Sequence, residues 1–283
     1  MSTAYIFPGQ GSQSVGMGSE LFDDFSELVS LADTILGYSL KTLCLEDPDG
    51  KLNLTQFTQP ALFTVNSLTY LKKIRETNGK PDFLAGHSLG EYTALFAGGA
   101  FDFETGVKLV QKRGELMGQA KGGGMAAVIG LGPDQVKDAL ASSGAGTVDV
   151  ANYNSPKQII LSGKVDDLEK IKQSFLDSGA RRFLPLKVSA AFHSRYMDEA
   201  GREFSRFLSS VDFGVLEIPV ISNVTARPYE SNNIRENLGK QITSSVRWQE
   251  SIEYLAEQGG LEFVEIGPGN VLTKLVQQIM ATP

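Results

Sequence analysis

Short apolar or β-branched runs alternate with longer helical periods along this chain of 283 residues. Such alternation is typical of an α/β fold with a parallel sheet. Three consecutive glycines at residues 122–124 break the pattern and indicate a boundary. From there to residue 188 the expected order is strand, helix, strand, strand, helix, strand, as in a ferredoxin-like (βαββαβ) unit. We therefore predict a large domain (residues 1–123 and 190–283) with an inserted ferredoxin-like subdomain (residues 124–189).

The first long helix should start with Thr58 as its N-cap, carry Pro60 in its first turn and end at Gly79. Because the insertion separates the two parts of the large domain, residues on either side of it can face each other across a cleft, where ligands commonly bind. In all, we expect helices at residues 58–79, 90–98, 104–120, 133–143, 166–178, 195–209 and 271–279, and strands at 4–7, 83–85, 125–129, 147–152, 158–162, 182–188, 218–222 and 262–266.

The composition argues against several classes of protein. A net charge of -7 disfavours nucleic acid as a partner, because a phosphate backbone needs a basic face. No apolar run approaches the roughly 20 residues that cross a membrane, and the start of the chain lacks the basic region of a secretory signal. We expect a cytoplasmic protein in which the single cysteine, Cys44, is a core residue and not a metal ligand. Two basic clusters are solvated faces or meet an acidic partner: Arg181, Arg182 and Lys187, and Arg195, Arg202 and Arg206.

The segment Gly86-His87-Ser88-Leu89-Gly90 matches the G-x-S-x-G pattern of a nucleophile elbow. It lies between an expected strand and an expected helix, which is the context that the elbow of an α/β-hydrolase-like domain requires. Glycines on both sides allow a strained turn, and the start of the helix directs amide donors at the serine. Ser88 is therefore the candidate nucleophile, although a tight turn with an idle serine would show the same pattern.

A nucleophilic serine needs a base, and the chain contains only two histidines. His87 adjoins Ser88 in a turn so tight that its side chain should point away from the serine. His193 lies where the chain leaves the inserted subdomain and returns to the large domain, so it can face the elbow across the cleft. We predict that His193 is the base.

The loop Phe7-Pro8-Gly9-Gln10-Gly11 resembles a phosphate-binding loop at first sight. It lacks the later glycine of a dinucleotide fingerprint, and no G-x-x-x-x-G-K-[ST] motif occurs in the chain. A phosphate cradle is therefore not expected here.

Five motifs together resemble the malonyl-CoA:acyl carrier protein transacylase family. They are FPGQGSQ near the N-terminus, GHSLGEY at the elbow, QKRGELM after it, AFHS beyond the insertion and EIGPGNVLT near the C-terminus. They cover nearly the whole chain in the family's order. The nearest likeness is to the freestanding acyltransferases that serve polyketide synthases in trans, with the transacylases of fatty-acid synthesis as the alternative.

The resemblance implies a role for several residues. Ser88 and His193 form a catalytic dyad, and the backbone amides of Gln10 and Leu89 form the oxyanion hole, where each donor is typically worth about 3 kcal/mol. An oxygen of Gln241 holds the histidine in place of a triad acid. No firm role is implied for the asparagines of the ANYNSP and SNVTA segments, which are Asn152, Asn154 and Asn223.

Two further residues are expected to select the acyl group. Arg113 puts a charge on the apolar stripe of its helix, three residues after Val110 and four before Met117. The family's matching arginine pairs with the malonyl carboxylate, and a structural ion pair is the alternative. Phe192 resembles the signature of malonyl-selecting members, with Leu89 in agreement, since an aromatic ring there should disfavour an extra methyl group by about 1 to 3 kcal/mol.

The resemblance implies an enzyme that moves a malonyl group from malonyl-CoA to the phosphopantetheine thiol of an acyl carrier protein through a Ser88 acyl-enzyme. Malonyl-CoA is then a substrate, and no metal or other cofactor is expected. A serine hydrolase or thioesterase is a less favoured alternative, because Arg113 would not suit an apolar acyl chain. A catalytically idle docking module would leave Ser88, His193 and Arg113 unexplained.

Overall fold

The computed structural model describes residues 2–281, and one of its two four-stranded sheets is entirely parallel. The strand order is β7-β2-β1-β8, with β1 (Ser2–Phe7) and β2 (Phe83–Gly86) at the centre and β7 (Val220–Ile221) and β8 (Leu261–Glu265) at the edges. In β1, Phe7 pairs with Gly86 of β2. The two central strands therefore end side by side, and the loops that follow them leave the sheet together.

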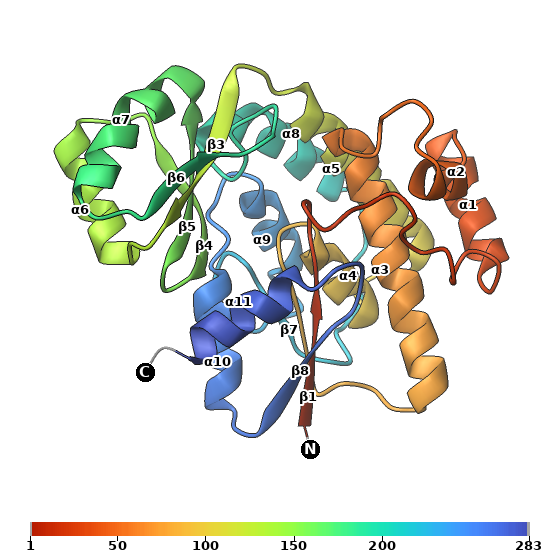
Figure 1. Ribbon diagram of the computed structural model, residues 1–283. Coiled ribbons are helices and arrows are strands. Elements are labelled where there is room, and N and C mark those ends of the chain that lie inside the picture. Colours follow the sequence, from red (N-terminus) through yellow and green to blue (C-terminus); the bar gives the residue numbers. More distant parts are fainter. Residues whose placement is uncertain (1, 282–283) are drawn as a thin grey trace.

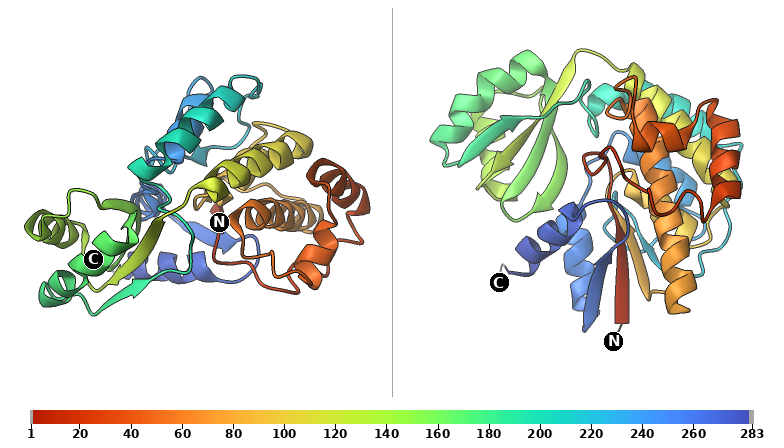
Figure 2. Two further views of the ribbon diagram at one scale, coloured as in Figure 1. Left: turned by 90° about the horizontal axis from the view of Figure 1, so that it is seen from above. Right: turned by 45° about the vertical axis from the view of Figure 1, so that its right-hand side comes forward.

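Helices cover both faces of this sheet (Figures 1 and 2). Alternate residues of β1 point to opposite faces, so that Tyr5 and Phe7 join the core formed with α3, α4 and α5, whereas Ala4 and Ile6 join the core formed with α10 and α11. The helices concerned are α3 (Thr55–Thr77), α4 (Gly90–Ala97), α5 (Phe103–Gln119), α10 (Trp248–Glu257) and α11 (Val271–Met280). The remaining helical segments of the large domain are α1 (Ser26–Leu36), α2 (Leu40–Leu45), η1 (Arg195–Met197), α8 (Asp198–Leu208) and α9 (Ile234–Gln241).

A second, antiparallel sheet forms a separate lobe with the strand order β4-β5-β3-β6. Its helices pack on one face of the sheet and share a hydrophobic core of their own with it. The elements of this lobe follow the predicted βαββαβ order: β3 (Gly123–Ile129), α6 (Pro133–Ser143), β4 (Asp149–Ser155), β5 (Gln158–Lys164), α7 (Val165–Asp177) and β6 (Arg182–Pro185). The predicted fold class, an α/β domain with an inserted ferredoxin-like unit, is confirmed.

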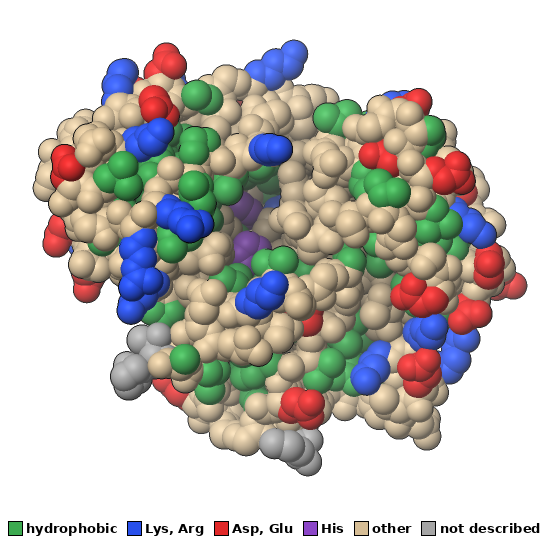
Figure 3. Space-filling view, viewed as in Figure 1, with side chains coloured by type: hydrophobic (Ala, Val, Ile, Leu, Met, Phe, Trp, Pro, Cys, Tyr) green, Lys and Arg blue, Asp and Glu red, His purple; other side chains and the backbone are tan. Residues whose placement is uncertain are grey.

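The two lobes meet along β4. The backbone of Val246 exchanges two hydrogen bonds with this strand, donating to Ala151 at 2.8 Å and accepting from Tyr153 at 2.9 Å. An exposed ion pair between Arg195 and Asp149 adds a second link. Figure 3 shows a hollow between the lobes, with histidine side chains visible in it. None of the helices formed by residues 2–281 is long and apolar enough to cross a membrane.

The start predicted for the first long helix is wrong. α3 begins at Thr55, with Leu54 at the N-cap, and the Thr58 hydroxyl inside the helix donates to carbonyls of the preceding turn. Pro60 therefore lies in the second turn. At the other end, Asn78 adopts the left-handed conformation with φ of 49° and closes the helix before Gly79, as asparagine can do in place of glycine.

Candidate active site

The predicted elbow is present, and its geometry explains its glycines. Ser88 has φ of 50°, a strained left-handed conformation, in the turn between β2 and α4. A Cβ at Gly86 would lie 2.0 Å from the backbone of Gly90, and one at Gly90 would lie 1.9 Å from the carbonyl oxygen of Phe7. Since no larger residue fits at either position, the chain can turn here and project Ser88 into the cleft between the lobes.

His193 reaches this serine from the segment that follows the inserted lobe. Its Nε2 lies 2.7 Å from Ser88 Oγ, while its Nδ1 lies 2.9 Å from the carbonyl oxygen of Gln241 and 3.2 Å from that of Ser244. Because carbonyl oxygens only accept, Nδ1 carries the proton, and Nε2 is left to accept the serine hydroxyl proton. The oxygen of Gln241 that holds the histidine is thus its backbone carbonyl.

The environment keeps His193 neutral. The side chain is buried, and burial followed by the charge of Arg113 lowers the pKa of His193 to about 3. His87 is engaged elsewhere, since its Nε2 lies 2.8 Å from Asn154 Oδ1 and its ring packs edge-on against Trp248. Of the two histidines, only His193 makes a hydrogen bond to Ser88 within residues 2–281.

Arg113 lies on the other side of Ser88 and is 1% exposed. One terminal nitrogen donates to Ser88 Oγ at 3.1 Å and to Gln241 Oε1 at 3.0 Å, and the other donates to Gln59 Oε1 at 2.8 Å. All these partners are neutral, and the arginine forms no ion pair within the described chain. The structural ion pair considered from the sequence is therefore absent from residues 2–281, and a buried cation faces the hydroxyl of Ser88.

The loop after β1 lies against the elbow. A Cβ at Gly9 would be 2.4 Å from the carbonyl oxygen of His87, so this glycine allows the two turns to touch. Gln10 follows in this loop, and its side chain extends to Thr55, with 3.4 Å between Nε2 and Oγ1. Leu89, directly after the nucleophile, is buried at the start of α4. The positions suit the predicted oxyanion hole.

Phe192 is buried directly before His193, in the same hydrophobic cluster as Leu89. Its carbonyl oxygen accepts from the hydroxyl of Ser162 on β5, with 2.7 Å between the oxygens. The segment that carries His193 is thus anchored to the antiparallel sheet.

Two further residues organise the elbow: Asn223, to which the sequence assigned no firm role, and Glu91, which sequence reasoning missed. Asn223 Oδ1 accepts from the backbone N–H of Ser88 at 2.7 Å, and its Nδ2 donates to the carbonyl of Gly86 at 2.6 Å. Glu91 is fully buried and accepts from the backbone of Asn223, from Tyr229 and from the side chain of Gln241. Burial raises the pKa of Glu91 to about 7, against the opposing effect of these hydrogen bonds. An acidic residue three positions after the nucleophile was the one signal for Glu91 in the sequence.

The structure gives no support for a metal site at these residues. Within residues 2–281, no group of three or more histidine, cysteine, aspartate or glutamate side chains is arranged to hold a metal ion. Cys44 is buried in the core, and burial raises the pKa of its thiol to about 12. The thiol is therefore protonated and poorly reactive.

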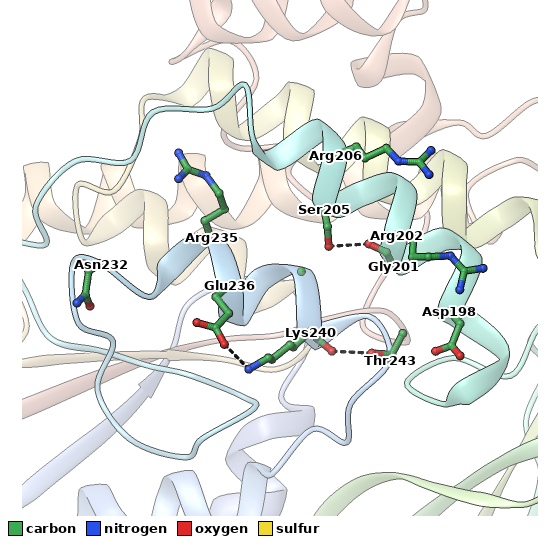
Figure 4. A pocket seen from close by; sticks show the side chains of 11 residues that line it. Asp198, Gly201, Arg202, Ser205, Arg206, Asn232, Arg235, Glu236, Lys240 and Thr243 are labelled. Atoms are coloured by element: carbon green, nitrogen blue, oxygen red, sulfur yellow. Dashed lines mark hydrogen bonds and ion pairs between the residues drawn. The ribbon is translucent and has the colours of Figure 1, made fainter.

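Two residues of the second basic cluster, Arg202 and Arg206, border a groove of about 910 Å³ between α8 and α9 (Figure 4). Arg202, Arg206, Arg235 and Lys240 line it together with Asp198 and Glu236. Lys240 pairs with Glu236, and Arg206 pairs with Glu203 on its own helix. The charges of the groove are mixed and partly satisfied locally, which favours the interpretation as a solvated face.

Comparison with known proteins places the chain in a family. The family described as "Acyl transferase domain" matches residues 4–282. The polyketide biosynthesis malonyl CoA-acyl carrier protein transacylase BaeC of Bacillus velezensis is 58% identical over 97% of this chain and 96% of its own. The chain belongs to the malonyl CoA-acyl carrier protein transacylase family. The resemblance seen in its motifs is confirmed.

Solved structures of transacylases share the whole fold. The malonyl CoA-acyl carrier protein transacylase of Burkholderia pseudomallei is 47% identical and superimposes with a TM-score of 0.96, covering 100% of this chain and 99% of its own. A transacylase named PlMCAT, solved in complex with the type II polyketide synthase acyl-carrier protein AntF, is 37% identical with a TM-score of 0.94, covering 100% of this chain and 94% of its own. Both likenesses include the two-lobed arrangement that forms the site.

Proposed function

We propose that this transacylase moves a malonyl group from malonyl-CoA, through a Ser88 acyl-enzyme, to the phosphopantetheine thiol of an acyl carrier protein. One observation carries the proposal: Ser88 Oγ lies between the Nε2 of His193, at 2.7 Å, and the buried guanidinium of Arg113, at 3.1 Å. A base on one side activates the serine. A cation without a counterion on the other side suits an acyl group that ends in a carboxylate.

The reaction proceeds in two halves that use the same residues. In the first, His193 takes the Ser88 proton as Oγ attacks the thioester carbonyl, and the amides of Gln10 and Leu89 stabilise the oxyanion. When the intermediate collapses, the C–S bond breaks and the CoA sulfur leaves with the proton from His193. In the second half, His193 takes the proton of the carrier thiol, the thiol attacks the Ser88 ester, and the proton returns to Ser88.

The proposed dyad needs no carboxylate behind its histidine. The carbonyls of Gln241 and Ser244 fix the Nδ1–H tautomer of His193. The sulfur of a thioester also leaves more readily than an amine, so His193 needs to give it less help by protonation when the C–S bond breaks. Proton transfers and acyl transfers account for every step, and we propose that the enzyme uses no metal or other cofactor.

Acyl selection in this proposal rests on Arg113 and Phe192. Arg113 binds the carboxylate of malonyl, and the ring of Phe192 next to His193 crowds a methyl group on the α-carbon, at a cost of about 1 to 3 kcal/mol.

The 58% identity to BaeC supports a role in polyketide biosynthesis, with fatty-acid synthesis as the second candidate. We also keep as proposals a cytoplasmic location and the division into residues 1–123 with 190–283 and residues 124–189, which the separate core of the antiparallel lobe supports.

Intact mass spectrometry tests the function. The protein is mixed briefly with malonyl-CoA, methylmalonyl-CoA or acetyl-CoA, and the mass of the chain is measured. We expect a malonyl adduct on Ser88 that forms faster than the other two and that carrier protein removes faster than water does. Loss of the adduct to water at the same rate with and without carrier protein would favour a hydrolase and contradict the proposal.

A further inference from the structure

A buried carboxylate lies one helical turn beyond the nucleophile and takes no part in the proposed chemistry. Glu91 follows Ser88 by three residues and is 0% exposed. Its Oε1 accepts from the backbone N–H of Asn223 at 2.9 Å and from the Tyr229 hydroxyl at 2.6 Å, and its Oε2 accepts from Nε2 of Gln241. A carboxylate this deeply buried needs such donors. One of them, Gln241, also contacts the site.

The side chain of Gln241 is held in one orientation by neighbours that only accept or only donate. Its Nε2 donates to the Glu91 carboxylate and to the carbonyl of Ser88 at 2.9 Å, and its Oε1 accepts from Arg113 at 3.0 Å. An arginine has donors and no acceptor, whereas an ionised carboxylate has acceptors and no donor. Turning the amide over would set donor against donor at Arg113 and acceptor against acceptor at Glu91. The carboxylate therefore acts together with the carbonyl of Ser88 to keep the oxygen of Gln241 facing Arg113.

This arrangement also keeps Arg113 without a direct counterion. The guanidinium contacts neutral oxygens of Gln59, Gln241 and Ser88, and the negative charge of Glu91 lies behind the Gln241 amide. A carboxylate in direct contact would form a strong charge-assisted pair with the guanidinium and compete with an incoming carboxylate. The negative charge of Glu91, separated from Arg113 by the neutral Gln241 amide, still stabilises the buried guanidinium. The N–H groups of Arg113 remain directed at Ser88.

We propose that Glu91 is a positioning residue for malonyl selection, which acts through the Gln241 amide to hold the Arg113 guanidinium beside Ser88 without neutralising it. The proposal rests on the proposed function, because Arg113 has a carboxylate to bind only when the acyl group is malonyl. Glu91 itself contacts neither the substrate nor the reacting atoms.

The test compares Glu91→Gln with wild type in the acylation of Ser88 by malonyl-CoA and by acetyl-CoA. Assays are run at about pH 8, where Glu91 is ionised, because its pKa is raised only to about 7. The substitution keeps the size of the side chain but removes its charge. With the new amide oxygen facing Asn223 and Tyr229, its NH₂ group lies against the NH₂ of Gln241 and loosens the side chain that positions Arg113. We expect KM for malonyl-CoA to rise about tenfold or more, with kcat and both acetyl-CoA parameters within about threefold of wild type.

Two further variants separate positioning from folding. Tyr229→Phe is a matched control, since it removes a different hydrogen bond to the Glu91 carboxylate and leaves the bond to Gln241; it should lower thermal stability and leave the ratio of malonyl to acetyl transfer unchanged. The exchange Glu91→Gln with Gln241→Glu covers the case in which the single variant does not fold. It keeps the number of charges but brings the carboxylate against Arg113, and it should fold with a reduced preference for malonyl.

Equal losses on both substrates in Glu91→Gln would show that Glu91 only supports the fold and would overturn the inference. An exchange variant that keeps the wild-type preference would overturn it as well. If the wild-type protein forms the malonyl adduct while Glu91→Gln keeps its preference, the inference alone fails. If the wild-type protein forms no malonyl adduct, the proposed function fails and the inference fails with it.

Discussion

Replacing Arg113 by alanine is the sharpest test of the site, because the Arg113 guanidinium donates a hydrogen bond directly to the proposed nucleophile, Ser88. The side chain is 1% exposed, and one of its nitrogens lies 3.1 Å from Ser88 Oγ. Arg113→Ala removes the cation that we assign to the malonyl carboxylate and leaves Ser88 and His193 in the chain. The malonyl charge would then be bound without a partner in a partly enclosed cleft.

The magnitude follows from the burial of the arginine. Truncating one partner of a buried, hydrogen-bonded charge pair costs about 2 to 5 kcal/mol. At about 1.4 kcal/mol for each factor of ten, kcat/KM for malonyl-CoA should fall by roughly 30-fold to 4,000-fold. Acetyl-CoA has no carboxylate and escapes this loss. Arg113→Ala also leaves the side-chain oxygens of Gln59 and Gln241 without a donor, which lowers the stability of the protein by about 1 to 3 kcal/mol for each oxygen. This loss is the same with either substrate and does not change the preference between them.

The assay measures kcat/KM for malonyl-CoA and acetyl-CoA at about pH 8. Removing the cation lets the pKa of His193 rise from about 3 toward its ordinary value of 6.5, so His193 stays neutral in both proteins at this pH. Arg113→Lys is the control that keeps the charge and loses the planar fork, and it should give an intermediate loss. If Arg113→Ala lowers both substrates equally, the arginine supports the fold and does not select malonyl.

Three further predictions concern the nucleophile, the base and the elbow. Ser88→Ala should abolish the malonyl adduct in intact mass spectra, and an undiminished adduct would rule out Ser88 as the nucleophile. Because the pKa of His193 is lowered to about 3, this base stays neutral as the pH falls, so kcat/KM for acylation by acetyl-CoA, which does not depend on the charge of Glu91, should stay nearly level from about pH 8 to about pH 5; a decline centred near the ordinary histidine value of 6.5 would contradict the lowered pKa. Asn223→Ala removes two hydrogen bonds that hold the elbow and should lower the free energy of unfolding in urea by about 2 kcal/mol and slow acylation; unchanged stability would show that the elbow holds its shape without this side chain.

The fold was predictable where local signals agree with the global arrangement. α6 runs over Pro133–Ser143 as predicted, because a proline opens it and Gly144 closes it in the left-handed conformation. The start of α3 was not predictable from its caps, since Leu54 at the N-cap makes no side-chain capping bond. The prediction also lacked four helices, which are α1, α2, α9 and α10. α2 has only six residues, and the sequence of α9 is mostly polar. Such helices gain most of their stability from tertiary packing.

The site was predictable as far as single residues carry their own chemistry. Ser88 stood out through its glycines, His193 through the scarcity of histidines, and Arg113 through a charge on an apolar stripe. Gln241 was expected only through the family resemblance, and Asn223 and Glu91 received no role, because the partners of these residues lie far apart in sequence. Asn223 follows Ser88 by 135 residues and Gln241 follows Glu91 by 150. Only the parallel sheet, which ends β1, β2 and β7 at one edge, brings these segments together.

The charge of Arg113 acts on both the substrate and the base in the proposed mechanism. In the free protein this cation is the second largest cause, after burial, of the low pKa of His193. A malonyl carboxylate bound to Arg113 would offset the cation and remove part of that effect. The basicity of His193 would then rise when an acyl group with a carboxylate is in place, because a base becomes stronger when a nearby positive charge is neutralised. An acetyl group brings no such charge, so it gains neither the ion pair nor the stronger base. A buried arginine without a direct counterion can therefore favour malonyl in binding and in the acylation step.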